Sequence, residues 1–147
     1  MILNIPSFDE AVLRQETKEV TFPLTSGQEQ LIFNMTETVI KKQGYALTAI
    51  QVDRPERIVV FDTGVVFINP VITRKWGKET HHSEECLSLP GVSVMVPRCK
   101  FIKVDYYDEK GILHSNQKFH KQKARTIQHE VDHLLNVIIS DYSRRGR

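Results

Sequence analysis

The sequence predicts an α+β fold in which short antiparallel strands pack around a central HExxH-bearing helix, following an N-terminal helix. Two segments, at residues 27–43 and 121–135, repeat apolar residues at the spacings of three and four that helices show. Between them, residues 57–115 form short runs of strand-forming residues separated by turn-forming ones. No internal repeat or linker interrupts the 147 residues, so we expect a single domain over residues 1–147.

The first helix is expected from about Gly27 to Gln43. Ser26 and Glu29 have the spacing of a capping box, in which each side chain accepts a hydrogen bond from the other's backbone N–H. Gly44 stands where a left-handed residue would end the helix. The apolar face would be formed by Leu31, Ile32, Met35, Val39 and Ile40.

The middle of the chain is expected to form strands. Arg57–Asp62 and Val65–Asn69 flank Thr63-Gly64, which is suited to a tight turn. Phe101–Tyr107 alternates in polarity as a strand does, and a turn after it leads into Ile112–Ser115. Short strands joined by tight turns are typical of antiparallel sheets, which is why the predicted class is α+β.

The second helix is expected from about Lys121 to Leu135. Its apolar stripe comprises Ala124, Ile127, Val131 and Leu134. His129 and His133 lie on nearly the opposite side, so this helix should be buried on both sides, against the core and against a site. Asn136 would provide a left-handed cap, and the apolar run Val137–Ile139 would then pack as a strand or tight turn.

Composition and charge exclude several classes of protein. The net charge of +2 argues for no nucleic-acid partner, and the basic run Lys118–Arg125 is interpreted as the solvated approach to the second helix. The basic tail Ser143–Arg147 is expected to be disordered. No apolar run is long enough to span a membrane, and residues 1–15 do not resemble an export signal. The sequence has two cysteines, too few for a disulfide framework, so we expect the protein in a reducing cytoplasm.

The strongest chemical signal is the HExxH motif His129-Glu130-Val131-Asp132-His133. Residues four apart project from the same face of a helix, so both imidazoles can bind one metal ion. Glu130 is offset by about 100° from His129, which suits a group that acts on a water molecule better than it suits a ligand. An accidental match on a polar helix face is rare, so the motif predicts metal binding.

A catalytic metal site usually has three protein ligands and one open position, so a third ligand is needed. The 14 residues after His133 contain no His, Glu or Cys, and Asp141 is their only carboxylate. The candidates upstream are His81, His82, Cys86, Cys99, His114 and His120. The histidines among them are interpreted as loop or surface residues and Cys99 as a buried structural thiol, whereas Cys86 lies in a polar segment.

Three segments carry a resemblance to a known family. Glu84–Ser88 is similar to the segment E-G-C-L-S of peptide deformylases, whose cysteine binds the metal. Gly44–Gln51 resembles the family's G-x-G-x-A-A-x-Q, and Gln128–Leu134 matches its Q-H-E-x-D-H-L closely. The segments occur in the family's order, and the resemblance extends from about Pro6 to Asp141.

The resemblance implies a metal-dependent hydrolase that removes the formyl group from N-formylmethionyl peptides, with residues 1–147 as its catalytic domain. The implied metal ligands are Cys86, His129 and His133, with water in the fourth position. Glu130 would act as general base and then as general acid. The Gln51 side-chain amide and the Leu87 backbone N–H would stabilise negative charge on the formyl oxygen. The resemblance favours iron(II) in the cell, and zinc, nickel and cobalt suit the same ligands.

The resemblance also implies where the substrate lies. The peptide would extend along Gly44, Tyr45, Ala46 and Glu85 by strand addition, with its methionine in an apolar pocket and Arg98 near the open end of the cleft. The partner would be an N-formylmethionyl peptide or nascent chain, in transient proximity to the ribosome. The expected location is the cytoplasm of a bacterium or of a phage-infected bacterial host.

The chain departs from the family's pattern at Ala46, Thr48 and Glu85, where the family has Gly, Ala and Gly. These changes bear on substrate preference more than on the reaction. The chain also resembles the short, bacteriophage-encoded members, which lack a further C-terminal helix. Two alternatives stay open: another metal-dependent amidase or HExxH metallopeptidase, and a non-catalytic zinc-stabilised module whose fourth metal position is filled by protein.

Overall fold

The computed structural model describes residues 1–145 and confirms the α+β class. Its helices are α1 (Glu10–Leu13), α2 (Ser26–Lys41), the 3-10 helix η1 (Ala49–Val52), α3 (Lys121–Leu134) and α4 (Ile139–Arg145). Its strands are β1 (Ala46–Thr48), β2 (Ile58–Phe61), β3 (Val66–Cys86), β4 (Leu89–Tyr107) and β5 (Leu113–His120). Within the described residues, no helix combines the length and the apolar character that crossing a membrane requires.

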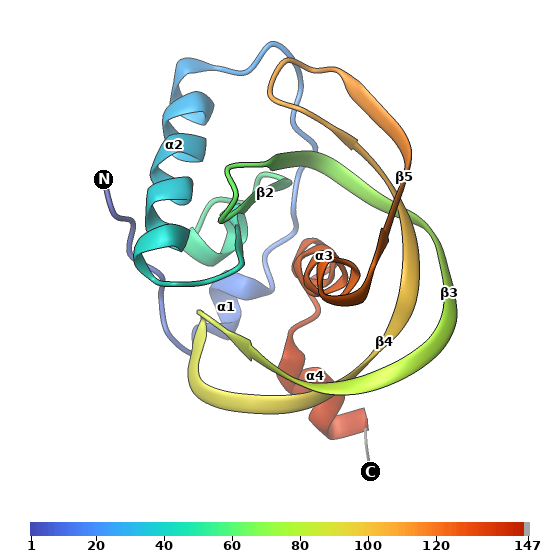
Figure 1. The fold of residues 1–147 in the computed structure, drawn as a ribbon. Helices are drawn as coiled ribbons and strands as arrows, with labels where there is room; N and C mark the ends of the chain where they lie inside the picture. The colour runs from blue at the N-terminus through green and yellow to red at the C-terminus, as the bar shows by residue number, and fades with distance from the viewer. Residues whose placement is uncertain (146–147) are drawn as a thin grey trace.

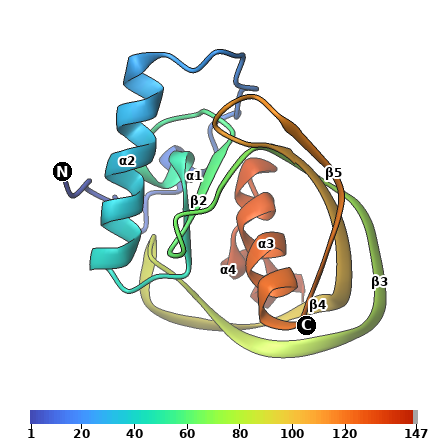
Figure 2. The same cartoon turned by 45° about the horizontal axis from the view of Figure 1, so that its top comes forward.

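The strands form one antiparallel sheet in the order β1-β2-β3-β4-β5. The sheet curls around α3, which lies inside the curve, whereas α2 packs beside β1 and β2 (Figure 1; Figure 2). β1 pairs with β2 and with no other described strand, so it forms one edge of the sheet. This arrangement places the β1 edge of the sheet beside α3.

β3 and β4 are far longer than the predicted short strands Val65–Asn69 and Phe101–Tyr107. β3 has 21 residues and β4 has 19. The register between them shifts at four points, and bulges at such points bend the paired strands without ending them. One shift contains Gly77, a turn-forming residue with φ 85°. His81 and His82, which the sequence placed in a polar loop, therefore lie in β3.

α2 begins and ends slightly earlier than predicted. Its N-cap is Thr25, whose hydroxyl accepts from the Gln28 N–H at 3.1 Å while the Gln28 side chain accepts from the Thr25 N–H at 3.0 Å. The predicted capping box was one residue later, because the same residue spacing occurs twice in succession here. The left-handed residue after the helix is Gln43, with φ 57°, and not Gly44.

The apolar stripe predicted on α3 is buried, as expected. Its four members are at most 7% exposed: Ala124, Ile127, Val131 and Leu134. They pack against the concave face of the sheet, in one cluster with Phe67, Ile102 and Val104. A second cluster joins α2 to β1 and β2 and includes Met35, Val39, Leu47 and Ile58. Because α3 is held by its apolar side, its opposite side has a fixed orientation.

The chain after α3 differs from the prediction. Asn136 has the predicted left-handed conformation, with φ 61°. The apolar run Val137–Ile139, predicted as a strand or tight turn, instead leads into α4, and its two isoleucines are buried. The tail predicted to be disordered, residues 143–147, continues α4 as far as Arg145. Residues 146–147 lie outside the described part of the chain.

Candidate metal centre

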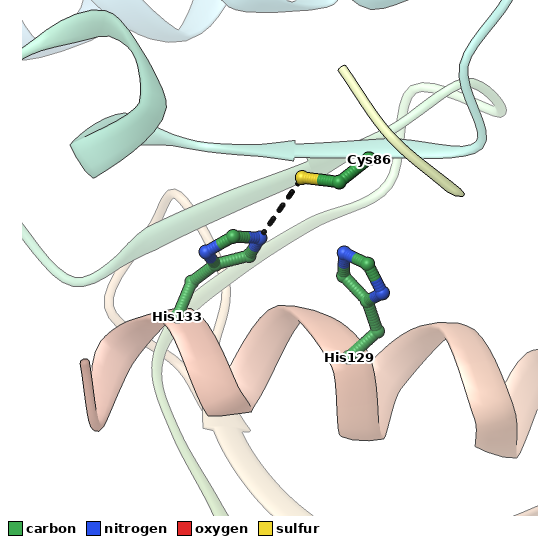
Figure 3. Close-up of side chains that lie close together, drawn as sticks. All are labelled: Cys86, His129 and His133. Atoms are coloured by element: carbon green, nitrogen blue, oxygen red, sulfur yellow. Dashed lines mark hydrogen bonds between the residues drawn. The ribbon is translucent and has the colours of Figure 1, made fainter. Parts of the chain in front are cut away.

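Three donor atoms converge between the end of β3 and the middle of α3. They are the Cys86 Sγ, one ring nitrogen of His129 and one of His133, and all lie within 4.8 Å of one another. Figure 3 shows both imidazoles rising from α3 toward the level of the Cys86 sulfur. The two histidines share a face because they are four residues apart on one helix. The structure thus brings together the three side chains that the resemblance selects as ligands.

The two imidazoles are held differently. His129 Nδ1 lies 2.9 Å from Glu84 Oε1, and because an ionised carboxylate can only accept, Nδ1 donates and Nε2 is the nitrogen left for a metal. His133 Nε2 lies 3.5 Å from the Cys86 Sγ. Its Nδ1 is buried and has no hydrogen-bond partner among the described residues. One thiol and two imidazoles at this separation fit a divalent metal of the zinc or iron(II) type.

Behind His129 lies a buried ionic network that we call the back wall: Glu84, Arg98, Arg125 and Asp132. Glu84 accepts from Arg98 Nη2 and Nε at 2.9 and 3.0 Å and from Arg125 Nη1 at 3.0 Å. Arg98 Nη1 also lies 2.6 Å from Asp132 Oδ2. Together with the bond from His129, these contacts use the acceptor positions of the Glu84 carboxylate and fix the imidazole against it.

The expectation that Arg98 lies near the open end of the cleft is wrong. Its side chain is 3% exposed and is absent from the cavity lining. Burial lowers the pKa of Arg98, but the bond to Glu84 and the charge of Asp132 outweigh it and raise that pKa. These partners are 14 and 34 residues away in the sequence, so no local pattern could indicate that the guanidinium turns inward.

The network sets the charge states at the site. Burial alone would raise the pKa of Glu84, but the hydrogen bond from His129 and the Arg98 guanidinium lower it to about 2. Burial also raises the pKa of the Cys86 thiol, and the neighbouring His133 and His129 lower it well below its usual value. A thiol that ionises readily is in the form that binds metals.

Glu130 lies beside the three donors without joining them. Its side chain is buried, and its Oε2 is 4.0 Å from His129 Nε2. Its Oε1 has no hydrogen-bond partner in the part of the chain that the structure describes. Burial raises the pKa of the Glu130 carboxyl, and the nearby histidines oppose that rise only in part. A carboxyl with a raised pKa and an unbonded oxygen is suited to receive and return a proton.

Gln51 reaches the site from η1. Its Nε2 lies 3.5 Å from the Cys86 Sγ and 3.0 Å from the Ser88 Oγ. Its Oε1 accepts from both the backbone N–H and the hydroxyl of Thr48, each at 3.0 Å. Thr48 therefore determines which end of the amide faces the sulfur. This threonine is one of the positions at which the chain departs from the deformylase pattern.

A cavity of about 760 Å³ opens in front of these groups. Nine of the predicted site residues line it: Gly44, Tyr45, Ala46, Gln51, Glu85, Cys86, Leu87, His129 and Glu130. Tyr45 and Glu85 are exposed at the surface, and we call these two residues the rim. Gly44 permits a close approach between two walls, since an added Cβ would lie 2.9 Å from the Leu87 side chain.

The cavity is less apolar than the methionine pocket that the resemblance implied. Leu87 and Leu89 contribute apolar surface, but Gln122 and Thr126 of α3 also line it. The Gln122 side chain donates to the Thr126 hydroxyl at 3.2 Å, which places a polar pair one to two turns before His129. The α3 wall of the cavity is therefore polar.

Sequence reasoning missed the back wall. Glu84 precedes Cys86 by two residues and Asp132 precedes His133 by one, and both lie within the motifs that carry the resemblance. A charged residue directly beside a buried ligand is a usable signal, because a buried charge requires a partner. The spacing of residues in the sequence does not predict which partners these charges find, which here include Arg98 and Arg125.

Comparison with known proteins agrees with this geometry. A family model described as polypeptide deformylase matches residues 2–147. The peptide deformylase of Blochmanniella floridana is 36% identical over 96% of this chain and 83% of its own length. That of Pelotomaculum thermopropionicum is 34% identical over 99% and 94%. The crystal structure of peptide deformylase from Thermotoga maritima superposes with a TM-score of 0.89 at 35% identity, covering 96% of this chain and 97% of that one.

Proposed function

The chain belongs to the peptide deformylase family, and on that premise we propose which residue performs each part of the reaction. It is a metal-dependent hydrolase that removes the formyl group from N-formylmethionyl peptides. The observation that carries the assignment of roles is the convergence of Cys86, His129 and His133 beside the buried Glu130. Residues 1–147 would act together as one catalytic domain.

Cys86, His129 and His133 would hold one divalent metal. A metal bound there would polarise the formyl group and lower the pKa of a water molecule toward neutrality. We propose iron(II) as the metal in the cell, with zinc, nickel or cobalt able to replace it, because a thiolate and two imidazoles suit all four. The lowered pKa of the Cys86 thiol supports its place among the ligands.

Glu130 would move the proton. Its carboxylate takes a proton from the water that attacks the formyl carbon, and it returns that proton to the amine nitrogen as the C–N bond breaks. The products are formate and a peptide with a free amino group. The raised pKa and the unbonded Oε1 of Glu130 support both halves of this role.

Gln51 and Leu87 would stabilise the negative charge that develops on the formyl oxygen. The Gln51 amide presents its Nε2 beside the Cys86 sulfur, because Thr48 holds the other end of the amide. The Leu87 N–H follows the Cys86 ligand directly in the chain. Donors that are held in place before the reaction need no reorganisation when the charge appears.

The peptide would pair with the open edge of β1, along Gly44, Tyr45 and Ala46, with Glu85 at the mouth of the cavity. The support is that β1 has a strand partner on one side only among the described strands. Backbone pairing of this kind depends little on side-chain sequence, which suits an enzyme that acts on many nascent chains. We propose that it acts in the cytoplasm of a bacterial or phage-infected cell, in transient proximity to the ribosome.

Protein purified without oxygen tests this proposal. Metal analysis should find about one divalent metal per chain, and a formyl-Met peptide should be hydrolysed far faster than its acetyl-Met counterpart. Comparable rates on the two peptides would instead indicate a broader amidase. A metal-containing protein that is inactive on both would indicate a structural zinc module.

The ligand assignment has a matched control in the second cysteine. Cys86→Ser should lose the metal and the activity, because it removes one of the three converging donors. Cys99→Ser should keep both, because Cys99 is half-buried and lies outside the cavity lining. Metal analysis and the formyl-Met assay check the pair, and the reverse result would move the ligand to Cys99.

A further inference from the structure

A cationic and aromatic patch lies on the convex face of the sheet, outside the cavity lining. Trp76 of β3 and Phe101 of β4 are cross-strand partners whose ring centroids are 5.5 Å apart, with planes inclined by 18°. Ile102 and Val104 point inward to α3, so Phe101 beside them points outward. Figure 1 shows α3 on the concave side of β3, β4 and β5, whereas α4 lies at one end of the curve, across β3 and β4.

Three cations lie over these two rings. The Arg74 guanidinium is 4.7 Å from the Trp76 centroid. The Lys118 ammonium is 5.6 Å from Trp76 and 5.3 Å from Phe101, and the Lys100 ammonium is 5.4 Å from Phe101. Attraction to the ring faces holds the charges near one another on the surface. We call these five residues the outer patch.

No carboxylate in the described part of the chain lies within ion-pair distance of the cations of the outer patch. None of the ion pairs among the described side chains includes Arg74, Lys100 or Lys118. Asp105, further along β4, has its Oδ1 engaged by the Asn116 N–H at 2.7 Å. The net charge of +2, which argued against a nucleic-acid partner, averages over the chain and conceals this positive face.

A purely structural role explains only part of the patch. The Phe101 ring covers Gly77, where an added Cβ would lie 2.8 Å from the ring, so Phe101 protects a bulge in β3. That role accounts for one aromatic residue. It does not account for three like charges held close together, which repel one another and are favoured where an anion neutralises them.

We propose that the outer patch binds a single strand of RNA. The cations complement successive phosphates, and the half-buried rings offer a surface on which a base can stack. An acidic peptide would use the charges but would leave the rings without a partner. The choice of RNA rests on the proposed function, because an enzyme that acts on nascent chains works beside ribosomal RNA.

Trp76 makes the proposal directly measurable. It is the only tryptophan in the sequence, so the intrinsic tryptophan fluorescence of the metal-loaded protein reports on the patch itself. Titration with a short labelled oligoadenylate should change the probe anisotropy and quench Trp76 in parallel. Because three phosphates would be neutralised, log affinity should fall with log salt concentration with a slope of about −2.

Two charge-matched variants locate the binding. The patch variant carries Arg74→Glu, Lys100→Glu and Lys118→Glu. The control variant carries Lys18→Glu, Lys41→Glu and Lys110→Glu, three exposed lysines outside the patch. The patch variant should lose about tenfold or more in RNA affinity and the control only a small part of that. Both should keep the wild-type rate on a short formyl-Met peptide, because none of these residues lines the cavity.

A milder variant, with Lys100→Gln and Lys118→Gln, guards against misfolding and should still weaken RNA binding severalfold with full deformylase activity. Equal losses in the patch and control variants would overturn the inference, as would RNA binding that leaves Trp76 fluorescence unchanged. Polyglutamate that competes as well as RNA at equal charge, or DNA that binds more tightly than RNA, would also overturn it. Full deformylase activity in each of these cases leaves the proposed function standing.

Discussion

Two consecutive glutamates differ in burial, because one belongs to the back wall and the other to the rim of the cavity. Glu84 is 7% exposed, and its carboxylate accepts bonds from His129 and from two arginines. Glu85 is exposed and accepts a hydrogen bond from the Ser93 hydroxyl at 3.2 Å. Successive residues of a strand point to opposite faces, so one step along β3 separates a buried positioning carboxylate from a solvated one.

The back wall and the rim therefore differ in how far they tolerate substitution. The back wall must be complete, because removing one member leaves a buried charge unpaired at a cost of about 3–5 kcal/mol. The rim tolerates change, because water compensates an exposed charge. Glu85 stands where the family has glycine, and it is not among the described residues with positive φ, so the substitution carries no backbone strain of that kind.

The largest effect is expected inside the cavity, at Glu130. Glu130→Gln removes the proposed proton acceptor and should lower kcat by about 10²–10⁴-fold. The metal content should stay at about one per chain, because Glu130 is not among the three converging donors. Rate measurements on a formyl-Met peptide and metal analysis check both parts. Joint loss of metal and activity would make Glu130 a ligand.

Glu84→Gln tests the back wall directly. The neutral amide cannot balance Arg98 and Arg125, and it holds His129 less firmly. Metal affinity should therefore fall about 10–100-fold, and the free energy of unfolding by about 3–5 kcal/mol. Glu85→Gln is the matched control at the rim and should change either quantity by less than about 1 kcal/mol. Chelator competition and urea unfolding measure the two effects, and equal responses at both positions would contradict the comparison.

Thr48→Ala should have a smaller effect. It removes the hydroxyl bond to Gln51 Oε1, which contributes about 1 kcal/mol, so kcat should fall about fivefold while KM stays unchanged. Thr48→Ser keeps a hydroxyl and should restore the rate. A variant that changes KM alone, or that serine fails to rescue, would show that Thr48 acts through packing and not through the amide.

An effect confined to high pH is expected where α4 meets the back wall. The Tyr142 hydroxyl donates to Asp132 Oδ2 at 2.7 Å, and burial, followed by this bond, raises the pKa of Tyr142 to about 12. A pKa raised by folding adds stability that is fully present below the unfolded value of about 10 and is lost as the pH rises toward about 12. Urea unfolding of wild type should therefore lose stability relative to Tyr142→Phe across this interval. A difference between the two proteins that does not vary with pH would refute this.

The sequence by itself determined the features that depend on local geometry. His129 and His133 share one face because helical spacing relates residues four apart, and the apolar stripe on the other side of α3 follows the same period. Asn136 takes the left-handed conformation expected after the helix. The α+β class followed from the same two periods, since helix and strand patterns are each contained within a few residues.

Only the tertiary structure decided how distant segments meet. β3 and β4 are long because they stay paired across bulges. The turn-forming residues within them therefore do not mark the ends of strands. The Arg98 side chain points inward because it forms ion pairs there with Glu84 and Asp132. Charged residues of these three types are usually exposed, so their residue types alone would place them at the surface. Such contacts join residues 14 to 45 positions apart, so the charge balance that stabilises them exists only when the sheet has closed around α3.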